Sequence, residues 1–83
     1  MRMGHVEIVE LLEIITNDRG VPRNIREKVT LAIAKVKLFN VTSLSEAIYL
    51  LDDISNDINM PEHARTDIWE AISLIEADKE KMK

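Results

Sequence analysis

The residues of this chain best suited to chemistry near neutral pH are its two histidines, His5 and His63. His63 and Asp67 are four residues apart, so on a helix both side chains would lie on one face and could contact one metal ion. Two ligands are too few for a metal site, and the equivalent position of an internal repeat, described below, holds Asn24 instead of a histidine. We therefore predict no metal site and expect His63 to be a solvated side chain in the first turn of a helix.

The acidic residues do not form a better site. Asp52 and Asp53 are adjacent, and adjacent residues on a helix point about 100° apart, so these two carboxylates do not share a cation. The sequence has no cysteine, no glycine-rich phosphate loop and no serine or threonine in a nucleophile elbow. We predict no catalytic residue, no cofactor and no small-molecule substrate, and expect that the chain is not an enzyme.

The chain contains an internal repeat, because residues 11–36 recur with many identities as residues 50–75. A repeat of this length is typical of a duplicated supersecondary unit. Each copy contains the motif Asn-Asp-x-x-[Val/Met]-Pro-x-x-x-Arg. The residues of this hairpin motif are Asp18, Pro22 and Arg26 in the first copy and Asp57, Pro61 and Arg65 in the second.

The hairpin motif predicts a tight connection between two helices. An aspartate here can accept hydrogen bonds from loop amides, and proline fits the first position of the next helix, where its missing N–H costs nothing. An arginine one turn later can fold back onto the aspartate as a charge-assisted pair. We therefore expect Arg26 to pair with Asp18, and Arg65 to pair with Asp57. In an alternative interpretation, Arg26 and Arg65 together form an anion site near the pseudo-symmetry axis.

Apolar residues recur at helical spacing in four segments, which predicts four helices. The expected helices are residues 6–17, residues 22 to about 40, residues 43–56 and a last helix from residue 61 to the C-terminal lysines. Ser43 and Glu46 predict a capping box at the start of the third helix. Because a single hairpin cannot cover its own apolar face, the two hairpins must pack together. We predict one all-α domain, residues 1–83, folded as a compact antiparallel four-helix bundle built from two repeated helical hairpins. The alternative is a pair of HEAT-like hairpin units.

Two segments around the prolines resemble the signature stretches of a known family. They are residues 21–26 (VPRNIR) and residues 59–66 (NMPEHART), the latter followed by Ile68 and Trp69. They are similar to the uncharacterised archaeal small-protein family numbered 0147 in the UPF series, and the similarity extends from about Val6 to Ile75. The resemblance implies an archaeal, all-helical protein of unknown function, without known site residues to transfer. Ile58 departs from the proline that the family pattern leads us to expect there, which relaxes the second turn.

Charge is distributed unevenly along the chain, whose net charge is -4. Residues 19–37 are basic with Glu27 as their one acid, whereas Arg65 is the one basic residue in the acidic segment 38–78. The two segments could pair within the fold, drive self-association, or leave an RNA or anion patch. That patch would consist of Arg19, Arg23, Arg26, Lys28 and Lys35. Nucleic acid is disfavoured, because the whole protein repels a polyanion and no aromatic residues are interleaved with the basic ones.

Several apolar residues fall outside the four core stripes and predict an interface. The candidate interface residues are Leu31, Leu38, Tyr49, Trp69 and Leu74. We therefore predict a small, non-enzymatic helical module that interacts with protein, either a second copy of itself or another chain. The alternative function is an RNA- or anion-binding accessory protein that uses the basic second helix.

Composition and segment lengths favour a folded cytoplasmic protein. Hydrophobic residues make up 46% of the chain and charged residues 31%, which is typical of a folded domain. No apolar stretch approaches the roughly 20 residues that span a bilayer, and the N-terminus does not read as a signal peptide. We expect no membrane association, and the absence of cysteine fits an intracellular setting.

Overall fold

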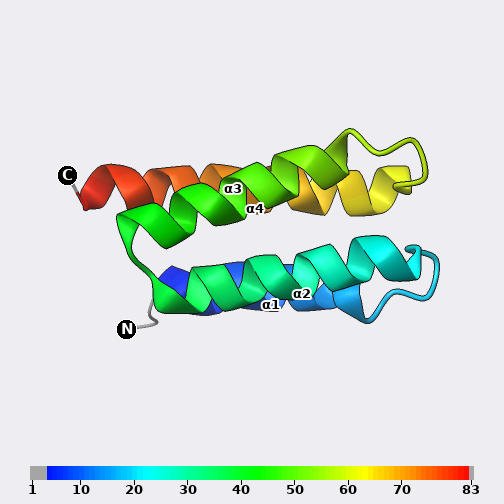
Figure 1. Ribbon diagram of the computed structural model, residues 1–83, viewed down its shortest axis with the longest axis horizontal. Coiled ribbons are helices and arrows are strands. Elements are labelled where there is room, and N and C mark those ends of the chain that lie inside the picture. The colour runs from blue at the N-terminus through cyan, green and yellow to red at the C-terminus, as the bar shows by residue number, and fades with distance from the viewer. Residues whose placement is uncertain (1–3, 83) are drawn as a thin grey trace.

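Four helices and no strand make up residues 4–82, the part of the chain that the computed structural model describes (Figure 1). The helices are α1 (Gly4–Thr16), α2 (Arg23–Leu38), α3 (Val41–Ser55) and α4 (Glu62–Lys81). The all-α prediction is confirmed. None of these helices combines the length and the apolar character needed to cross a membrane.

The two prolines of the hairpin motif precede their helices by one position. Pro22 and Pro61 occupy the N-caps of α2 and α4 with extended ψ angles of 147° and 145°, so the prediction that each proline opens its helix was one residue early. Neither proline supplies a side-chain cap. Their fixed φ angles, -55° and -60°, still direct the chain into the helix that follows.

The start of α3 differs from the prediction by one turn. Asn40 is the N-cap, and its side-chain oxygen accepts a hydrogen bond from the Ser43 amide at 2.8 Å while the Ser43 hydroxyl accepts from the Asn40 amide at 3.1 Å. The predicted capping box of Ser43 and Glu46 is therefore wrong. The reason lies in the preceding residue: Phe39 has φ 49° and ends α2 in a left-handed conformation, so Asn40 is immediately available to begin α3.

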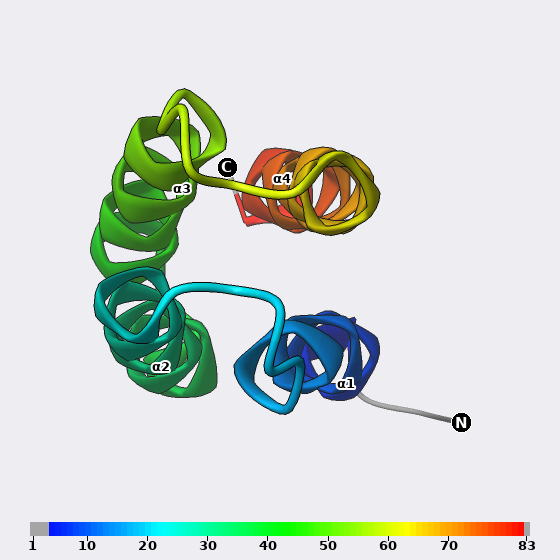
Figure 2. The ribbon, with the colours of Figure 1, turned by 90° about the vertical axis from the view of Figure 1, so that its right-hand side faces the viewer.

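The helices form a closed ring in which each packs against two antiparallel neighbours. Helix α1 contacts α2 and α4, and α3 contacts the same two helices. Figure 2 shows the four helices at the corners of a square, with the turns that follow α1 and α3 at one end of the bundle. In a stack of repeats, equivalent helices such as α1 and α3 would be the neighbours. The predicted bundle is thus confirmed over the HEAT-like alternative.

The core lies along the axis of the bundle and draws on all four helices and both turns. Large aliphatic side chains that are almost fully buried come from every helix, and alanines at four core positions allow the helices to approach closely. Each buried large aliphatic side chain contributes roughly 1.5–3 kcal/mol. The principal buried residues are Ile8, Leu12, Ile15, Val21, Ile25, Val29, Ala32, Val36, Leu44, Ala47, Leu51, Ile54, Met60, Ala64, Ile68, Ala71 and Ile75.

Candidate functional site

The two hairpin turns have the same local structure, as the sequence repeat requires. Asp18 Oδ1 accepts a hydrogen bond from the Gly20 amide at 2.8 Å, and Asp57 Oδ1 accepts one from the Asn59 amide at the same distance. An aspartate that bonds the backbone two residues on is a standard way to form a tight turn. Each aspartate therefore uses one carboxylate oxygen to shape its own turn.

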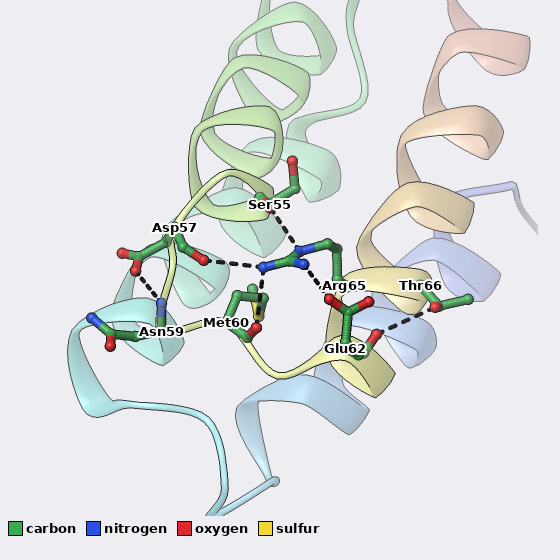
Figure 3. Close-up of polar contacts among 7 residues, drawn as sticks. All are labelled: Ser55, Asp57, Asn59, Met60, Glu62, Arg65 and Thr66. Atoms are coloured by element: carbon green, nitrogen blue, oxygen red, sulfur yellow. Dashed lines mark hydrogen bonds and ion pairs between the residues drawn. The ribbon is translucent and has the colours of Figure 1, made fainter.

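Arg65 ties the second turn together through the backbone (Figure 3). Its Nε donates to the Ser55 carbonyl at 2.9 Å, and its Nη2 donates to the carbonyls of Asp57 and Met60 at 3.3 and 3.2 Å. Its Nη1 donates to Glu62 Oε1 at 2.5 Å. The predicted pairing with the Asp57 carboxylate is wrong, since Arg65 contacts that residue through its main-chain oxygen. The guanidinium thus satisfies the Ser55 carbonyl, which the end of α3 leaves without a helical partner, and also bonds two carbonyls of the turn.

Arg26, the equivalent residue of the first repeat, does not reproduce this network. Its Nε is buried and has no hydrogen-bond partner within residues 4–82. Glu62, which receives a hydrogen bond from Arg65, is replaced in the first repeat by Arg23, and Arg23 pairs instead with Glu27 at 3.3 Å. The two arginines therefore differ in their surroundings, and the anion site near the pseudo-symmetry axis stays a prediction.

Asp18 contacts a residue of the other hairpin. Its Oδ2 lies 2.5 Å from His63 Nε2, in the first turn of α4. The hydrogen bond from His63 lowers the pKa of Asp18, as do the Gly20 amide and, more weakly, the charges of His63 and Arg26, against an opposing effect of burial. The predicted Asp18–Arg26 pair is thus replaced by Asp18–His63. His63 is a solvent-exposed side chain in the first turn of α4, as predicted, but it also contacts Asp18.

The turn end of the bundle contains no ready-made metal centre. Within residues 4–82, no three histidine, cysteine or acidic side chains are grouped so that they could hold a metal ion. The other histidine, His5, lies far along α1 from the turns and packs on Phe39, with ring centroids 5.5 Å apart. The polar residues of the turn end are placed to build turns and to connect the hairpins.

Three of the basic residues of α2 form ion pairs with acids. In the described part of the chain, one ion pair lies within α2 and two connect α2 to α3. They are Arg23–Glu27 at 3.3 Å, Lys28–Asp53 at 3.4 Å and Lys35–Glu46 at 3.4 Å. Of the residues of the predicted anion patch, Arg23, Lys28 and Lys35 thus have acidic neighbours in the fold. This arrangement corresponds to the first of the three uses of charge that the sequence suggested.

The predicted interface residues do not form one continuous patch. Leu31 and Leu38 on α2 and Tyr49 on α3 are exposed, with 78% of Tyr49 accessible to solvent. Trp69 is 55% exposed but lies on α4, whereas Leu74 is partly buried and packs against the core. Helical periodicity alone does not show how far a flanking position is covered by the neighbouring helix, and the interface role of Leu74 stays a prediction.

Leu31 and Tyr49 lie on opposite sides of an open hollow of about 260 Å³ between α2 and α3. Lys35, Glu46 and Leu50 complete its lining. Leu50 was not among the predicted interface residues, although its place outside the core stripe was the available signal. We call the surface around this hollow the α2–α3 face, and its residues are Lys28, Leu31, Lys35, Leu38, Glu46, Tyr49, Leu50 and Asp53.

Comparison with known proteins shows close relatives in archaea. Residues 5–77 match the model of the Uncharacterised protein family (UPF0147). A UPF0147 protein of Saccharolobus islandicus (strain L.S.2.15) is 44% identical over 77 residues, which cover 89% of this chain and 86% of that protein. A UPF0147 protein of Methanocaldococcus jannaschii is 46% identical over 72 residues, covering 83% and 77% of the two chains.

Two crystal structures have the same fold. A protein of unknown function, MMP1188, superposes with a TM-score of 0.82 at 39% identity, over 88% of this chain and 86% of that one. A protein of family UPF0147 from Thermoplasma acidophilum superposes with a TM-score of 0.81 at 32% identity, over 89% and 91%. These relatives are described by family or as being of unknown function, so they supply no site residues.

Proposed function

Since this chain belongs to the uncharacterised protein family UPF0147, whose matched members carry no assigned activity, we propose its function from its own surface. It is a small helical module that binds protein and is not an enzyme. Its docking site is the α2–α3 face. The proposal depends on residues that are exposed and apolar where the fold itself does not need them.

The observation that carries this proposal is the exposed apolar group around the hollow. Tyr49 is 78% exposed, and Leu31 and Leu38 lie about one turn before and one turn after Lys35 along the outer side of α2. Tyrosine is enriched at interface centres, because it buries a large apolar ring and keeps a polar hydroxyl. The ion pairs Lys28–Asp53 and Lys35–Glu46 give this group a polar rim, which is the usual anatomy of a protein interface.

The proposal that the chain is not an enzyme is supported by the use of its polar groups. The side chains best suited to chemistry, those of Asp18 and His63, bond to each other across the two hairpins. Arg65, the most highly bonded cation of the described chain, is occupied by backbone carbonyls and Glu62. These groups account for the geometry of the turns without a substrate.

The alternative function, binding of RNA or another anion, has weaker support. Lys28 and Lys35 lie within ion-pair distance of acids on α3, and the net charge of the chain is -4. A polyanion would have to displace Asp53 and Glu46 from these lysines while being repelled by the protein as a whole. A protein surface with both apolar and complementary charged groups meets no such barrier.

The test is affinity capture from an extract of the source organism with three forms of the tagged protein. Wild type is compared with Tyr49→Glu, which places a charge at the centre of the α2–α3 face, and with Ile14→Glu. Ile14 is a matched control, because it is 59% exposed but lies on α1. We expect a specific protein to be retained by wild type and by Ile14→Glu and to be lost from Tyr49→Glu.

Two results would contradict the proposal. Retention of the same proteins by all three forms would show that the α2–α3 face does not bind them. Capture that disappears after ribonuclease treatment, with Tyr49→Glu still active, would favour the RNA alternative instead. Circular dichroism of each form verifies that it is folded, so that a loss of capture is not caused by unfolding.

A further inference from the structure

We infer that the partner of the α2–α3 face is a second copy of this chain. In this dimer the two-fold axis runs parallel to α2 and α3 and lies between the two facing copies, above the hollow that separates the two helices. This inference rests on the proposed function, because it names the occupant of the same face. It is carried by the arrangement of charge on the face, which is complementary to itself under this one rotation.

The two halves of the face carry opposite charge. The α2 half presents Lys28 and Lys35, and the α3 half presents Asp53 and Glu46. Helices α2 and α3 lie side by side and antiparallel, which both ribbon views show (Figures 1 and 2). The face is therefore divided lengthwise into a basic strip and an acidic strip.

A rotation about an axis parallel to the strips exchanges their positions. The basic strip of the second copy then lies over the acidic strip of the first, and the reverse contact forms on the other side of the axis. A two-fold axis lying across the strips would instead place lysines on lysines and acids on acids, which is destabilising. Charge complementarity thus selects one of the two face-to-face arrangements.

The register of the charges also fits without any shift along the helices. Lys28 is level with Asp53 and Lys35 is level with Glu46, because each pair is within 3.4 Å inside one chain. A rotation about an axis parallel to the helices keeps every residue at its own level. Lys35 of the second copy therefore faces Glu46 of the first, and each ion pair becomes a cluster of four charges with alternating sign.

The apolar residues meet at the level between these clusters. Leu31 lies across the hollow from Tyr49 and Leu50 within one chain, so the rotation places Leu31 of the second copy over Tyr49 and Leu50 of the first. A hollow of about 260 Å³ has room for a leucine side chain. Two symmetry-related contacts of this kind would bury the most exposed aromatic ring of the described chain, that of Tyr49.

The size of the face sets the expected strength of the dimer. Helix α2 has 16 residues, and at about 1.5 Å per residue the face is roughly 24 Å long. Two helices of about 10 Å diameter make it roughly 20 Å wide. The area of the face given by this length and width is smaller than the roughly 800 Å² that each partner buries in a standard interface. We therefore expect a weak dimer, with a dissociation constant on the order of 10 µM.

Charge reversal tests the arrangement by sedimentation equilibrium. Lys35→Glu alone and Glu46→Lys alone each place like charges opposite one another twice in the dimer, so each variant should dimerise at least about tenfold more weakly than wild type. An equimolar mixture of the two variants should recover a heterodimer, because every facing pair is then of opposite charge. Arg23→Glu is the matched control. It makes the same charge change on α2, but Arg23 is not a residue of the α2–α3 face and pairs within α2, with Glu27, so its dimer should be unaffected.

Two outcomes would overturn the inference. One is a wild-type protein that stays monomeric at about 1 mM, roughly a hundred times the expected dissociation constant. The other is a mixture of Lys35→Glu and Glu46→Lys that associates no better than either variant alone although both are folded by circular dichroism. If wild type is monomeric but Tyr49→Glu still loses a captured protein, the face docks another chain. In that case the docking face is correct, and only the inference that its partner is a second copy is wrong.

Cysteine pairs test the direction of the axis, since the chain has no cysteine of its own. In the proposed dimer Leu31 of one copy faces Tyr49 of the other, and the two Leu31 side chains are separated by about one helix spacing, roughly 10 Å. A mixture of Leu31→Cys and Tyr49→Cys should therefore form a disulfide-linked heterodimer on mild oxidation. Faster cross-linking of Leu31→Cys with itself would show the other axis and contradict the inference.

Discussion

Asp18 Oδ2 and His63 Nε2 lie 2.5 Å apart and connect the turn of one repeat to the first turn of α4 in the other. The contact has no counterpart by symmetry, because Asn24 occupies the position equivalent to His63. The two hairpins are near-copies in sequence and in turn structure. Asp18 and His63 mark where they have become different, and the contact between them fixes one hairpin against the other at the turn end.

We predict that stability falls at acid pH in a way that requires Asp18. The hydrogen bond from His63 holds the pKa of Asp18 below its ordinary value of 3.8. A carboxyl whose folded pKa is depressed stabilises the fold above its unfolded pKa, and this contribution is lost as pH falls through the folded value. Thermal unfolding of wild type from pH 7 to pH 2 should therefore show a fall in melting temperature below pH 3.8 that Asp18→Asn lacks. Parallel melting-temperature curves for the two proteins would contradict this.

The two arginines of the hairpin motif should differ in importance. Arg65→Met leaves the carbonyls of Ser55 and Met60 without the guanidinium donor, whereas the Asp57 carbonyl keeps its hydrogen bond from the Met60 amide. An unpaired buried polar group costs about 1–3 kcal/mol. Arg26→Met, at the equivalent position, removes a buried Nε that has no partner in the described chain, so it should cost clearly less or be neutral. Urea unfolding of the two variants measures the difference. Equal losses would mean that the turns are stabilised in the same way.

The start of α3 offers a test of which residues cap it. Asn40→Ala removes the acceptor of the Ser43 amide and should lower the free energy of unfolding by about 1 kcal/mol. Glu46→Ala, which would be equally damaging if Ser43 and Glu46 formed the capping box, removes only the exposed pair with Lys35 and should have a smaller effect. Chemical denaturation ranks the two variants, and the reverse order would restore the original capping assignment.

Core truncation should be severe in a chain of this length. Ile68 is fully buried in the first half of α4, and Ile68→Ala should cost about 2–5 kcal/mol, a large part of the stability of a small domain. Leu31→Ala, at a residue that is 49% exposed on the α2–α3 face, should cost less than about 1 kcal/mol at concentrations where the protein is monomeric. Comparable losses in urea titrations would place Leu31 in the core.

The parts of the fold that depend on local spacing were predictable from the sequence. The apolar periodicity of α1 to α4 and the two proline turns follow from residues within a few positions of one another. The first residue of α3 was misplaced because Asn40 is as suited to following one helix as to beginning the next, and only the left-handed Phe39 decides between them.

The contacts of the hairpin motif were less predictable for a different reason. Asp57 could accept from either Arg65 or its own turn, and the sequence does not show that the Asn59 amide takes the carboxylate while Arg65 takes the carbonyl. Asp18 and His63 are 45 residues apart, so their contact depends on how the hairpins are placed in the ring. Leu50 in the hollow and Leu74 against the core depend on the same placement.

The closed ring of helices makes the order of the two hairpins along the chain interchangeable. The beginning of α1 and the end of α4 lie at the same end of the bundle on adjacent helices, so a short linker between them would replace the connection at Phe39 (Figure 1). A circular permutant opened between Phe39 and Asn40 would read the second hairpin first, and Phe39 would no longer have to adopt its left-handed conformation. The architecture is thus specified by which surfaces the hairpins share, and not by which hairpin the ribosome makes first.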